Sequence, residues 1–186
     1  MTQESSAFRY PATRERVREG TVEHDALDQF VIEARRRPGK ELRVRVDEAV
    51  PPQVEDRLAT RDVLVRRAVR AVDGRPAAIE TSYYPRDLTS GTELEDPADI
   101  SRGTIQVLAE LGHAQTGYLD EVAAHTLSAR EAADLETPEA APALRLVRTA
   151  WSGERVLRVT ITVTPLGGGM VLCYEIGGPA PAGAAV

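Results

Sequence analysis

The residues best suited to binding chemistry are Arg70 and Glu80, which lie in two runs of sequence with the character of strands. Runs 63–72 and 76–84 are rich in β-branched and aromatic residues, and the Asp73-Gly74 pair between them is typical of a hairpin turn. The hairpin brings an arginine and a carboxylate together on one sheet face. They would form either a cross-strand ion pair worth under ~1 kcal/mol or a clamp that holds an anionic group and accepts hydrogen bonds from hydroxyls.

Two registers of this hairpin are open. A two-residue turn places Arg67 opposite Glu80. A three-residue loop with a bulge places Ala68 opposite Glu80, and Arg70 is then a neighbour one pair along on the same face. Ser82 shares the face of Glu80 because side chains alternate along a strand.

No familiar catalytic or cofactor motif accompanies this pair. The sequence has no P-loop, GxSxG or HExxH motif, and His24, His113 and His125 lack the spacing of metal ligands. The run 167–169 of three glycines joins two predicted strands and is typical of a turn, and Cys173 alternates with apolar residues as a small core residue does. We therefore expect no metal, no cofactor and no enzymatic activity.

Composition and charge narrow the class of protein. A chain of 186 residues with 42% hydrophobic and 28% charged residues suits one soluble domain. Its 23 Lys and Arg against 29 Asp and Glu give a net charge of −6, which argues against direct nucleic-acid binding. There is no apolar run of membrane-spanning length and no signal peptide, and a single cysteine excludes disulfides, so we expect a cytoplasmic protein without membrane contact.

Helices and a strand flank the first hairpin. Apolar residues at helical spacing predict a helix over 25–37, which Pro38-Gly39 would end. A strand over 42–50 and a short helical turn ending near Leu58 follow. Beyond the hairpin, a loop rich in Gly, Thr, Asp and Pro spans about 86–99.

A second set of elements follows this loop. A helix is predicted over 104–111, with Thr104 as its N-cap, and a strand over 118–125. Ser128 and Glu131 then form a capping box that opens another helix.

The last part of the chain is a second hairpin, with strands over 143–151 and 156–164 and a turn at Ser152-Gly153, followed by a strand over 170–176. The order strand, helix, hairpin therefore occurs twice. It predicts an α+β protein with a central antiparallel sheet flanked by helices and built from two related strand–helix–hairpin units. We expect a cleft where the two halves meet, and small-molecule sites favour such junctions.

Several stretches share their order and spacing with a known family: VLVRRAVRAVDGRPAAIETSYYPRDLTSGT, RGTIQVLAELGH, EVAAHTLSAREAADL, ALRLVRTAWSGERVLRVTITVTPL and VLCYEI. In them the chain resembles the UTRA domain, the effector-binding module of the HutC branch of GntR-type bacterial transcription regulators. The polar residues 1–20 predict an N-terminal arm or linker and the low-complexity residues 177–186 a flexible tail, and the resemblance places the UTRA domain over 21–176.

The resemblance implies a chorismate lyase-like α+β fold and a regulator that binds a small-molecule effector, an anionic or polyhydroxylated metabolite. It also implies a homodimer. The family normally carries a winged helix before this domain, and the roughly 20 residues before the first helix cannot form one. We therefore expect DNA contact only through a winged-helix domain outside this chain, which would be either the effector half of a longer regulator or a head-less member.

Ligand-binding residues are carried over only where this sequence matches the family pattern. Arg102 and Thr104 match the loop that opens the second helix, where free backbone N–H groups could hold an anion. Tyr174 stands where a tyrosine of the final strand commonly approaches the ligand, and Arg158 lies where many members carry an acidic residue. The expected ligand-binding residues are Arg70, Glu80, Ser82, Arg102, Thr104, Arg158 and Tyr174.

Two other functions stay open. A chorismate lyase-like enzyme acting on a small aromatic acid would share the fold, but it needs a closed, dry pocket and its own Arg/Glu pair. A head-less dimerisation partner that binds no ligand would fill its cleft with apolar side chains.

Overall fold

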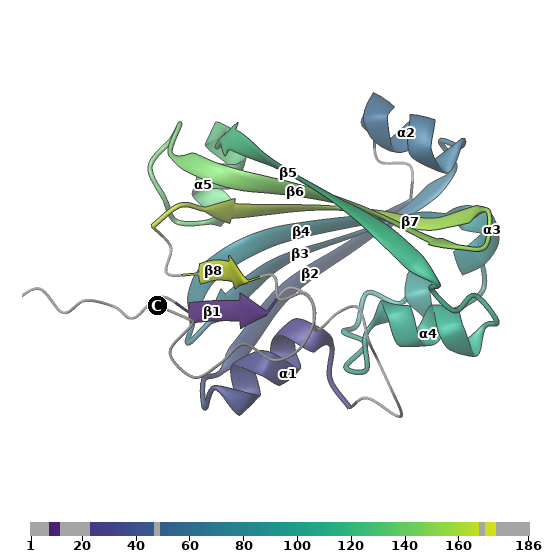
Figure 1. Cartoon of the computed structure of the whole chain (residues 1–186), viewed down its shortest axis with the longest axis horizontal. Coiled ribbons are helices and arrows are strands. Elements are labelled where there is room, and N and C mark those ends of the chain that lie inside the picture. The colour runs from purple at the N-terminus through teal and green to yellow at the C-terminus, as the bar shows by residue number, and fades with distance from the viewer. Residues whose placement is uncertain (1–7, 12–22, 47–48, 168–169, 174–186) are drawn as a thin grey trace, which may run out of the picture.

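A six-stranded antiparallel sheet forms the centre of the molecule, with helices on both faces (Figure 1). The computed structural model describes residues 8–11, 23–46, 49–167 and 170–173. The strand order in the large sheet is β2-β3-β4-β7-β6-β5, and every neighbouring pair runs antiparallel. This is the α+β architecture that the sequence predicts.

Two units of the same order build the sheet. The first consists of β2 (Pro38–Val46), α2 (Pro52–Leu58), β3 (Val63–Val72) and β4 (Arg75–Pro85). The second consists of β5 (Gly117–Thr126), α5 (Ala129–Asp134), β6 (Pro142–Ser152) and β7 (Arg155–Pro165). The units meet where β4 pairs with β7, so the predicted strand–helix–hairpin repeat is confirmed.

The first hairpin adopts the register in which Ala68 lies opposite Glu80. The turn itself has two residues, Asp73 and Gly74, both with positive φ (53° and 79°), which suits the Asp-Gly sequence. The pairing then shifts by one residue between Arg70 and Ala71. A two-residue turn followed by a bulge therefore gives the register that the sequence analysis assigned to a three-residue loop.

Helix α1 (Ala26–Glu33) is shorter than predicted. Arg35 takes a left-handed conformation, and the N–H groups of Arg35 and Arg36 donate to the carbonyl oxygens of Ile32 and Val31, which is a Schellman ending. Pro38-Gly39, expected to stop the helix, instead begins β2, since proline is tolerated at the first position of an edge strand.

Helix α4 (Thr104–Glu110) also begins differently from the prediction. Its N-cap is Gly103, with φ of 83°, and Thr104 is its first helical residue. The preceding segment, predicted as a loop, contains the short helix α3 (Arg86–Thr89) and the 3-10 turn η2 (Glu93–Glu95). The capping box of Ser128 and Glu131 at α5 is confirmed.

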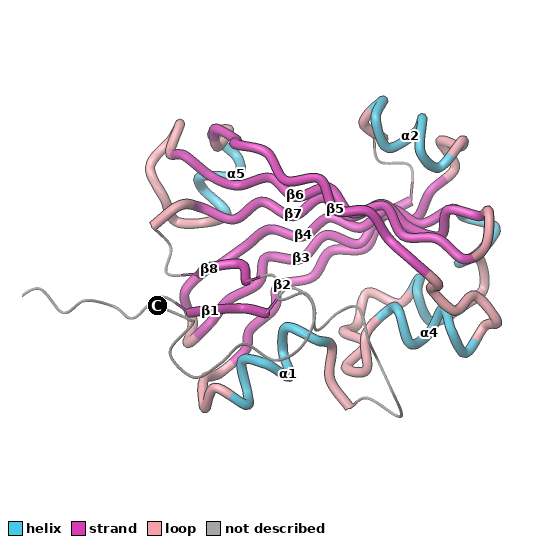
Figure 2. The backbone as a smooth tube through the Cα atoms, in the orientation of Figure 1, coloured by secondary structure: helices cyan, strands magenta, loops and turns pink. Residues whose placement is uncertain are grey.

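Different helices cover the two faces of the sheet (Figure 2). Val54 and Leu58 of α2, and Ala132 of α5, pack into clusters with the odd-numbered apolar residues of the central strands, such as Val159 and Val163. On the other face α4 packs on an apolar cluster of Leu64, Tyr84, Leu88, Leu94, Ile100, Val107, Leu108 and Leu157. Helix α1 covers Val72 and Ala77 at the far end of the same face.

A separate two-stranded sheet lies beside α1. Strand β1 (Phe8–Pro11) pairs in parallel with β8 (Met170–Cys173). Four residues of the segment expected to be an N-terminal arm thus form a strand, and residues 174–176 of the predicted last strand lie outside the described residues. None of the described helices has the length and hydropathy that a membrane-spanning segment requires.

Candidate functional site

A cleft lies between the sheet and the helices α1 and α4. Strands β4 and β7 supply the middle of its floor, and residues from the beginnings of α1 and α4 form part of its walls. The cleft is therefore at the junction of the two units, where the repeat in the sequence places it.

The floor of the cleft is polar. Glu80 and Ser82 come from β4, and Thr160, Thr162 and Thr164 come from β7. The Oγ of Ser82 and the Oγ1 of Thr160 are 2.8 Å apart and form a hydrogen bond. A floor built for stability alone would be apolar, because every buried hydroxyl requires a partner. The central strands thus present hydroxyl groups and one carboxylate to the cleft.

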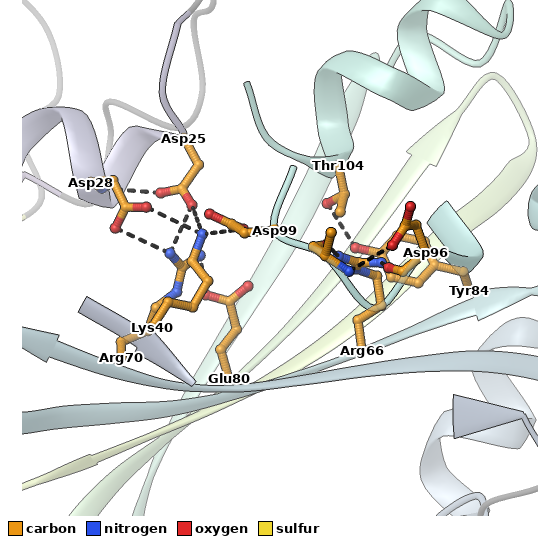
Figure 3. Close-up of polar contacts among 11 residues, drawn as sticks. Asp25, Asp28, Lys40, Arg66, Arg70, Glu80, Tyr84, Asp96, Asp99 and Thr104 are labelled. Atoms are coloured by element: carbon orange, nitrogen blue, oxygen red, sulfur yellow. Dashed lines mark hydrogen bonds and ion pairs between the residues drawn. The ribbon is translucent and has the colours of Figure 1, made fainter. Parts of the chain in front are cut away.

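A cluster of charged groups fills the end of the cleft at α1 (Figure 3). Arg70 Nη1 lies 2.7 Å from Asp25 Oδ2 and 3.3 Å from Asp28 Oδ1, and its Nη2 lies 3.4 Å from Glu80 Oε2. The predicted pairing of Arg70 with Glu80 is present, but the nearest carboxylate to Arg70 belongs to Asp25, the N-cap of α1.

Lys40 extends this cluster from β2. Its Nζ lies 2.9 Å from Asp25 Oδ2, 3.2 Å from Asp28 Oδ2 and 2.8 Å from Asp99 Oδ1. The chain's only lysine therefore joins α1 to the loop before α4. Four carboxylates surround two cations, so this end of the cleft carries an excess of negative charge.

The pKa values of the cluster follow from burial and from these contacts. Burial alone would raise the pKa of Asp25, but the charges of Arg70 and Lys40 outweigh it and hold that pKa well below its usual range. Burial and the neighbouring Asp25 raise the pKa of Asp28. The carboxylates raise the pKa of Lys40 and of Arg70 against the opposing effect of burial, so both cations stay charged.

Arg66 binds the backbone of the loop that lies beside α4 at the wall of the cleft. Its Nη1 donates to the carbonyl oxygens of Leu94 (2.6 Å) and Asp96 (2.8 Å), and its Nη2 donates to that of Ala98 (3.1 Å). Arg66 is buried, and these bonds satisfy a loop backbone that would otherwise lack partners. Its role in the described structure is to fix the 94–98 loop, as the right side of Figure 3 shows.

Arg148 lies on β6, at the other end of the row of side chains that contains Arg66. Its Nε and Nη2 donate to the two carboxylate oxygens of Asp120, each at 2.7 Å, and its guanidinium lies 4.4 Å from the centre of the Tyr118 ring. Cross-strand pairing places Arg66, Ser82, Thr160 and Arg148 in one row across the sheet. The two arginines thus flank the central hydroxyl pair.

Arg158 differs from the other three buried arginines of this face. It lines the cleft, is only 6% exposed, and its Nε is buried with no hydrogen-bond partner. Among the described residues no side chain forms an ion pair with its guanidinium. Arg70 also has an unpartnered Nε, but its two terminal nitrogens contact carboxylates.

The structure brings five of the expected ligand-binding residues to the cleft: Arg70, Glu80, Ser82, Thr104 and Arg158. Thr104 contributes its hydroxyl, which accepts a hydrogen bond of 2.8 Å from the Tyr84 hydroxyl. Tyr174 lies outside the described residues.

Arg102 does not line the cleft. Its guanidinium forms ion pairs with Glu93 and with Glu110, at the end of α4. The expected anion site at the loop that opens this helix therefore lacks its arginine, which bridges two surface carboxylates instead.

Sequence reasoning missed Asp25, Lys40 and the Arg148–Asp120 pair. Asp25 carried one available signal, since Asp at the start of a predicted helix is a typical N-cap. That it also faces Arg70 depends on where α1 packs, which no local pattern encodes. The described residues contain no group of three His, Cys, Asp or Glu side chains that could hold a metal ion.

Comparisons with known proteins agree with this architecture. The family model of the UTRA domain matches residues 33–166. A structure assigned to the GntR family of transcriptional regulators superimposes with a TM-score of 0.77 at 20% identity, covering 93% of this chain and 71% of that one. The effector domain of PhnF from Mycobacterium smegmatis gives a TM-score of 0.69 at 17% identity, covering 92% of this chain and all (100%) of that one.

The C-terminal domain of the histidine utilization repressor from Pseudomonas syringae pv. tomato str. DC3000 gives a TM-score of 0.63 at 19% identity, covering 76% of this chain and 100% of that one. No curated protein matches the chain. At these identities the structural likenesses establish the fold, which is the expected chorismate lyase-like α+β fold. The family match extends over most of the sequence. The chain therefore belongs to the UTRA domain family.

Proposed function

We propose that the chain is the effector-binding domain of a GntR/HutC-type transcriptional regulator and that its cleft binds a small metabolite. The polar floor at the junction of the two units carries this proposal. Four polar residues of the central strands line the cleft: Glu80, Ser82, Thr160 and Thr162. Such convergent polar groups in a cleft are typical of small-molecule sites.

The proposal favours a regulator over an enzyme of the same fold. UTRA domains are regulatory modules, and the cleft offers hydrogen-bond acceptors and donors without a recognisable nucleophile or metal among the described residues. In this proposal a winged-helix domain makes the contact with DNA. The cytoplasmic location expected from the sequence stays a prediction.

A homodimer is part of the same proposal. Strand β5 is an open edge of the large sheet, and its residues 121–124 are exposed. An unpaired edge of this kind is a template for pairing with another strand, and a second copy of the chain offers an identical one.

A thermal-shift screen tests the effector-binding role. The purified chain is screened against sugar phosphates, amino acids, nucleosides and aromatic acids, and a ligand at ~100 times its Kd should add about 2.7 kcal/mol of stability. Replacing a floor hydroxyl with Thr162→Val should weaken the response, whereas Thr149→Val, at a register position on the opposite face, should preserve it.

Two outcomes would contradict the proposal. Absence of any stabilising compound would remove support for a ligand sensor and favour a dimerisation module. Turnover of chorismate or a related aromatic acid, followed by absorbance, would establish the enzyme instead.

A further inference from the structure

We propose that Arg158 is the anion receptor of the cleft, so that the effector is a small organic acid whose anionic group binds Arg158 while a hydrogen-bond-donating group faces Glu80. This inference rests on the proposed function and adds the chemical class of the effector and its orientation.

The first argument is the state of Arg158 itself. A buried guanidinium is costly unless it is paired, and Arg66, Arg70 and Arg148 all have carbonyl or carboxylate partners. Arg158 is as buried as they are, lines the cleft and has no such partner among the described residues. The missing partner is therefore an anion that enters from the cleft.

The second argument is the register of the second hairpin, which directs Arg158 toward the cleft beside a bulge. The β6–β7 pairing shifts by one residue between Ala150 and Trp151, and Ala150 lies opposite Arg158. Arg158 shares the face of Thr160 and Thr162 because side chains alternate along β7, and Leu157 is the extra residue at the shift. With the shift, Leu157 packs in the cluster under α4 and Arg158 also lines the cleft. Bulges commonly redirect side chains at binding sites.

The third argument comes from the internal repeat. The β3–β4 hairpin has its bulge at the equivalent place, where Arg70 lies opposite Ala78. Each hairpin thus has one arginine opposite an alanine beside its bulge, on the first strand for Arg70 and on the second for Arg158, and both arginines line the cleft. Arg70 is held there by the carboxylates of Asp25 and Glu80. Arg158 has no carboxylate partner among the described residues, so an anionic group is the kind of group that it would bind.

The opposite end of the cleft sets the orientation. Glu80 pairs across the strands with Thr162, which lies four positions from Arg158 on β7, about 13 Å along the strand. Carboxylates outnumber cations around Glu80, so an anionic group is repelled there and an ammonium or hydroxyl group is favoured. An organic acid with an ammonium or hydroxyl group at the end opposite its anionic group therefore fits both ends of the cleft.

The test compares Arg158→Met with the wild type and with Arg145→Met, a matched control on the same hairpin that lines a groove on the opposite face. In buffer of fixed ionic strength, sodium acetate or sodium methyl phosphate replaces sodium chloride while the Tm is measured. The wild type and R145M should gain stability saturably with the anion, and R158M should not. R158M should also have a Tm at or above that of the wild type without anion, because it removes an unpaired buried charge.

Acetate and methyl phosphate distinguish a carboxylate effector from a phosphorylated one by which of them gives the larger saturable rise. The orientation is tested with 6-aminohexanoate, 6-hydroxyhexanoate and hexanoate. Either terminal donor should raise affinity over hexanoate in the wild type, and Glu80→Gln should reduce that advantage. Equal affinity for all three in the wild type would overturn the orientation.

The assignment of Arg158 would be wrong if R158M unfolded more easily than the wild type and showed the same response to anions. Arg158→Lys, which keeps the charge, should retain part of the anion response. If the metabolite screen finds an effector whose affinity R158M leaves unchanged, the proposed function stands and this inference falls. An effector that does depend on Arg158 should lose at least about 30-fold in affinity.

Discussion

At the scale of single residues, the buried arginines of the cleft differ in the groups that they bind. Arg66 and Arg148 each satisfy groups of the protein itself, a loop backbone and a carboxylate. Arg70 pairs with Asp25, which it shares with Lys40, and with the half-buried Glu80. These three arginines have protein partners, whereas Arg158 forms no ion pair among the described residues.

Arg70→Met should therefore unfold the domain more easily rather than act only on ligand binding. The variant leaves the carboxylates of Asp25 and Asp28 with Lys40 as their remaining cation, and breaking a buried ion pair from one side costs about 3–5 kcal/mol. Urea unfolding measures this loss. Arg45→Met, at an exposed position of β2, is the control and should change stability by less than about 0.5 kcal/mol. An equally small change in both variants would show that Arg70 is not needed for the fold.

The acid limb of the stability curve should depend on Asp25. Its pKa in the folded chain lies below the ordinary value of 3.8, so its contribution is present above pH ~4 and is lost as the pH falls through the folded pKa. Asp25→Asn keeps a good N-cap residue but removes the charge. Chemical unfolding of both proteins between pH 7 and 2 should give a difference that is largest near neutrality and shrinks on acidification.

Asp28 supplies the contrasting case. Its pKa is raised, so its ionisation as the pH increases opposes folding, and Asp28→Asn should not reproduce the acid-dependent loss of Asp25→Asn. The prediction for Asp25 fails if the stability difference between D25N and the wild type is the same at every pH.

At the scale of elements, the sequence predicted strands and hairpins well because their signals are local. Asp73-Gly74 fixes a tight turn, and alternation of side chains fixes which residues share a face. The bulges were harder, since a one-residue shift leaves the local composition unchanged. Strict alternation along β7 would put Leu157 on the face opposite Arg158, whereas the bulge lets it pack on the same side.

Helix ends and contacts between helices depended on tertiary structure. The sequence predicted a helix as far as residue 37, but Arg35 leaves the helical conformation and β2 begins at Pro38. The pairing of β1 with β8 joins segments from the two ends of the sequence, and no local pattern reports it. The hairpin is a local pattern, and it predicted Arg70 beside Glu80. The contacts of Asp25 and Lys40 with this pair depend on tertiary packing and were not predicted.

The β5–β6 pair offers a test of strand packing. Gly117 lies opposite Trp151, and a Cβ at Gly117 would come within 2.9 Å of the indole ring. Gly117→Ala should therefore displace the ring and destabilise the chain by about 1–3 kcal/mol. Trp151 is the only tryptophan, so its fluorescence reports both the displacement and the unfolding curve.

Gly153→Ala is a useful comparison for this prediction. Its Cβ meets nothing within 4 Å, although its positive φ of 56° adds backbone strain. G153A should lose stability without shifting the emission of the native state. A native spectrum unchanged in G117A would contradict the close packing of Gly117 under the indole.

At the scale of the whole molecule, the duplicated unit explains why the cleft lies where it does. Two strand–helix–hairpin units meet at β4 and β7, and the face that α2 and α5 leave open is covered by α1 and α4. Duplication also gives each hairpin a bulge at an equivalent place. Arg70, beside the first bulge, pairs with the protein's own carboxylates, and Arg158, beside the second, forms no ion pair among the described residues.

The two edges of the sheet are not equivalent, and this difference predicts how copies of the chain would associate. Strand β2 carries exposed charges at Glu41, Arg43 and Arg45, which discourage pairing. Strand β5 presents the exposed run 122–124 of small and apolar residues, and its carboxylates are already paired within the chain, Asp120 among them. A homodimer should therefore form through β5.

Val122→Lys should convert such a dimer to a monomer, because two lysines would face each other across the new strand pair and repel. Sedimentation equilibrium over a range of concentrations measures the dissociation constant. Val46→Lys places the same charge on the β2 edge, at a residue of similar exposure (41% against 48%), and should leave the dimer intact. If both variants dissociate alike, or if V122K stays dimeric, β5 is not the interface. Retained cleft binding in the V122K monomer would further show that one chain holds the complete site.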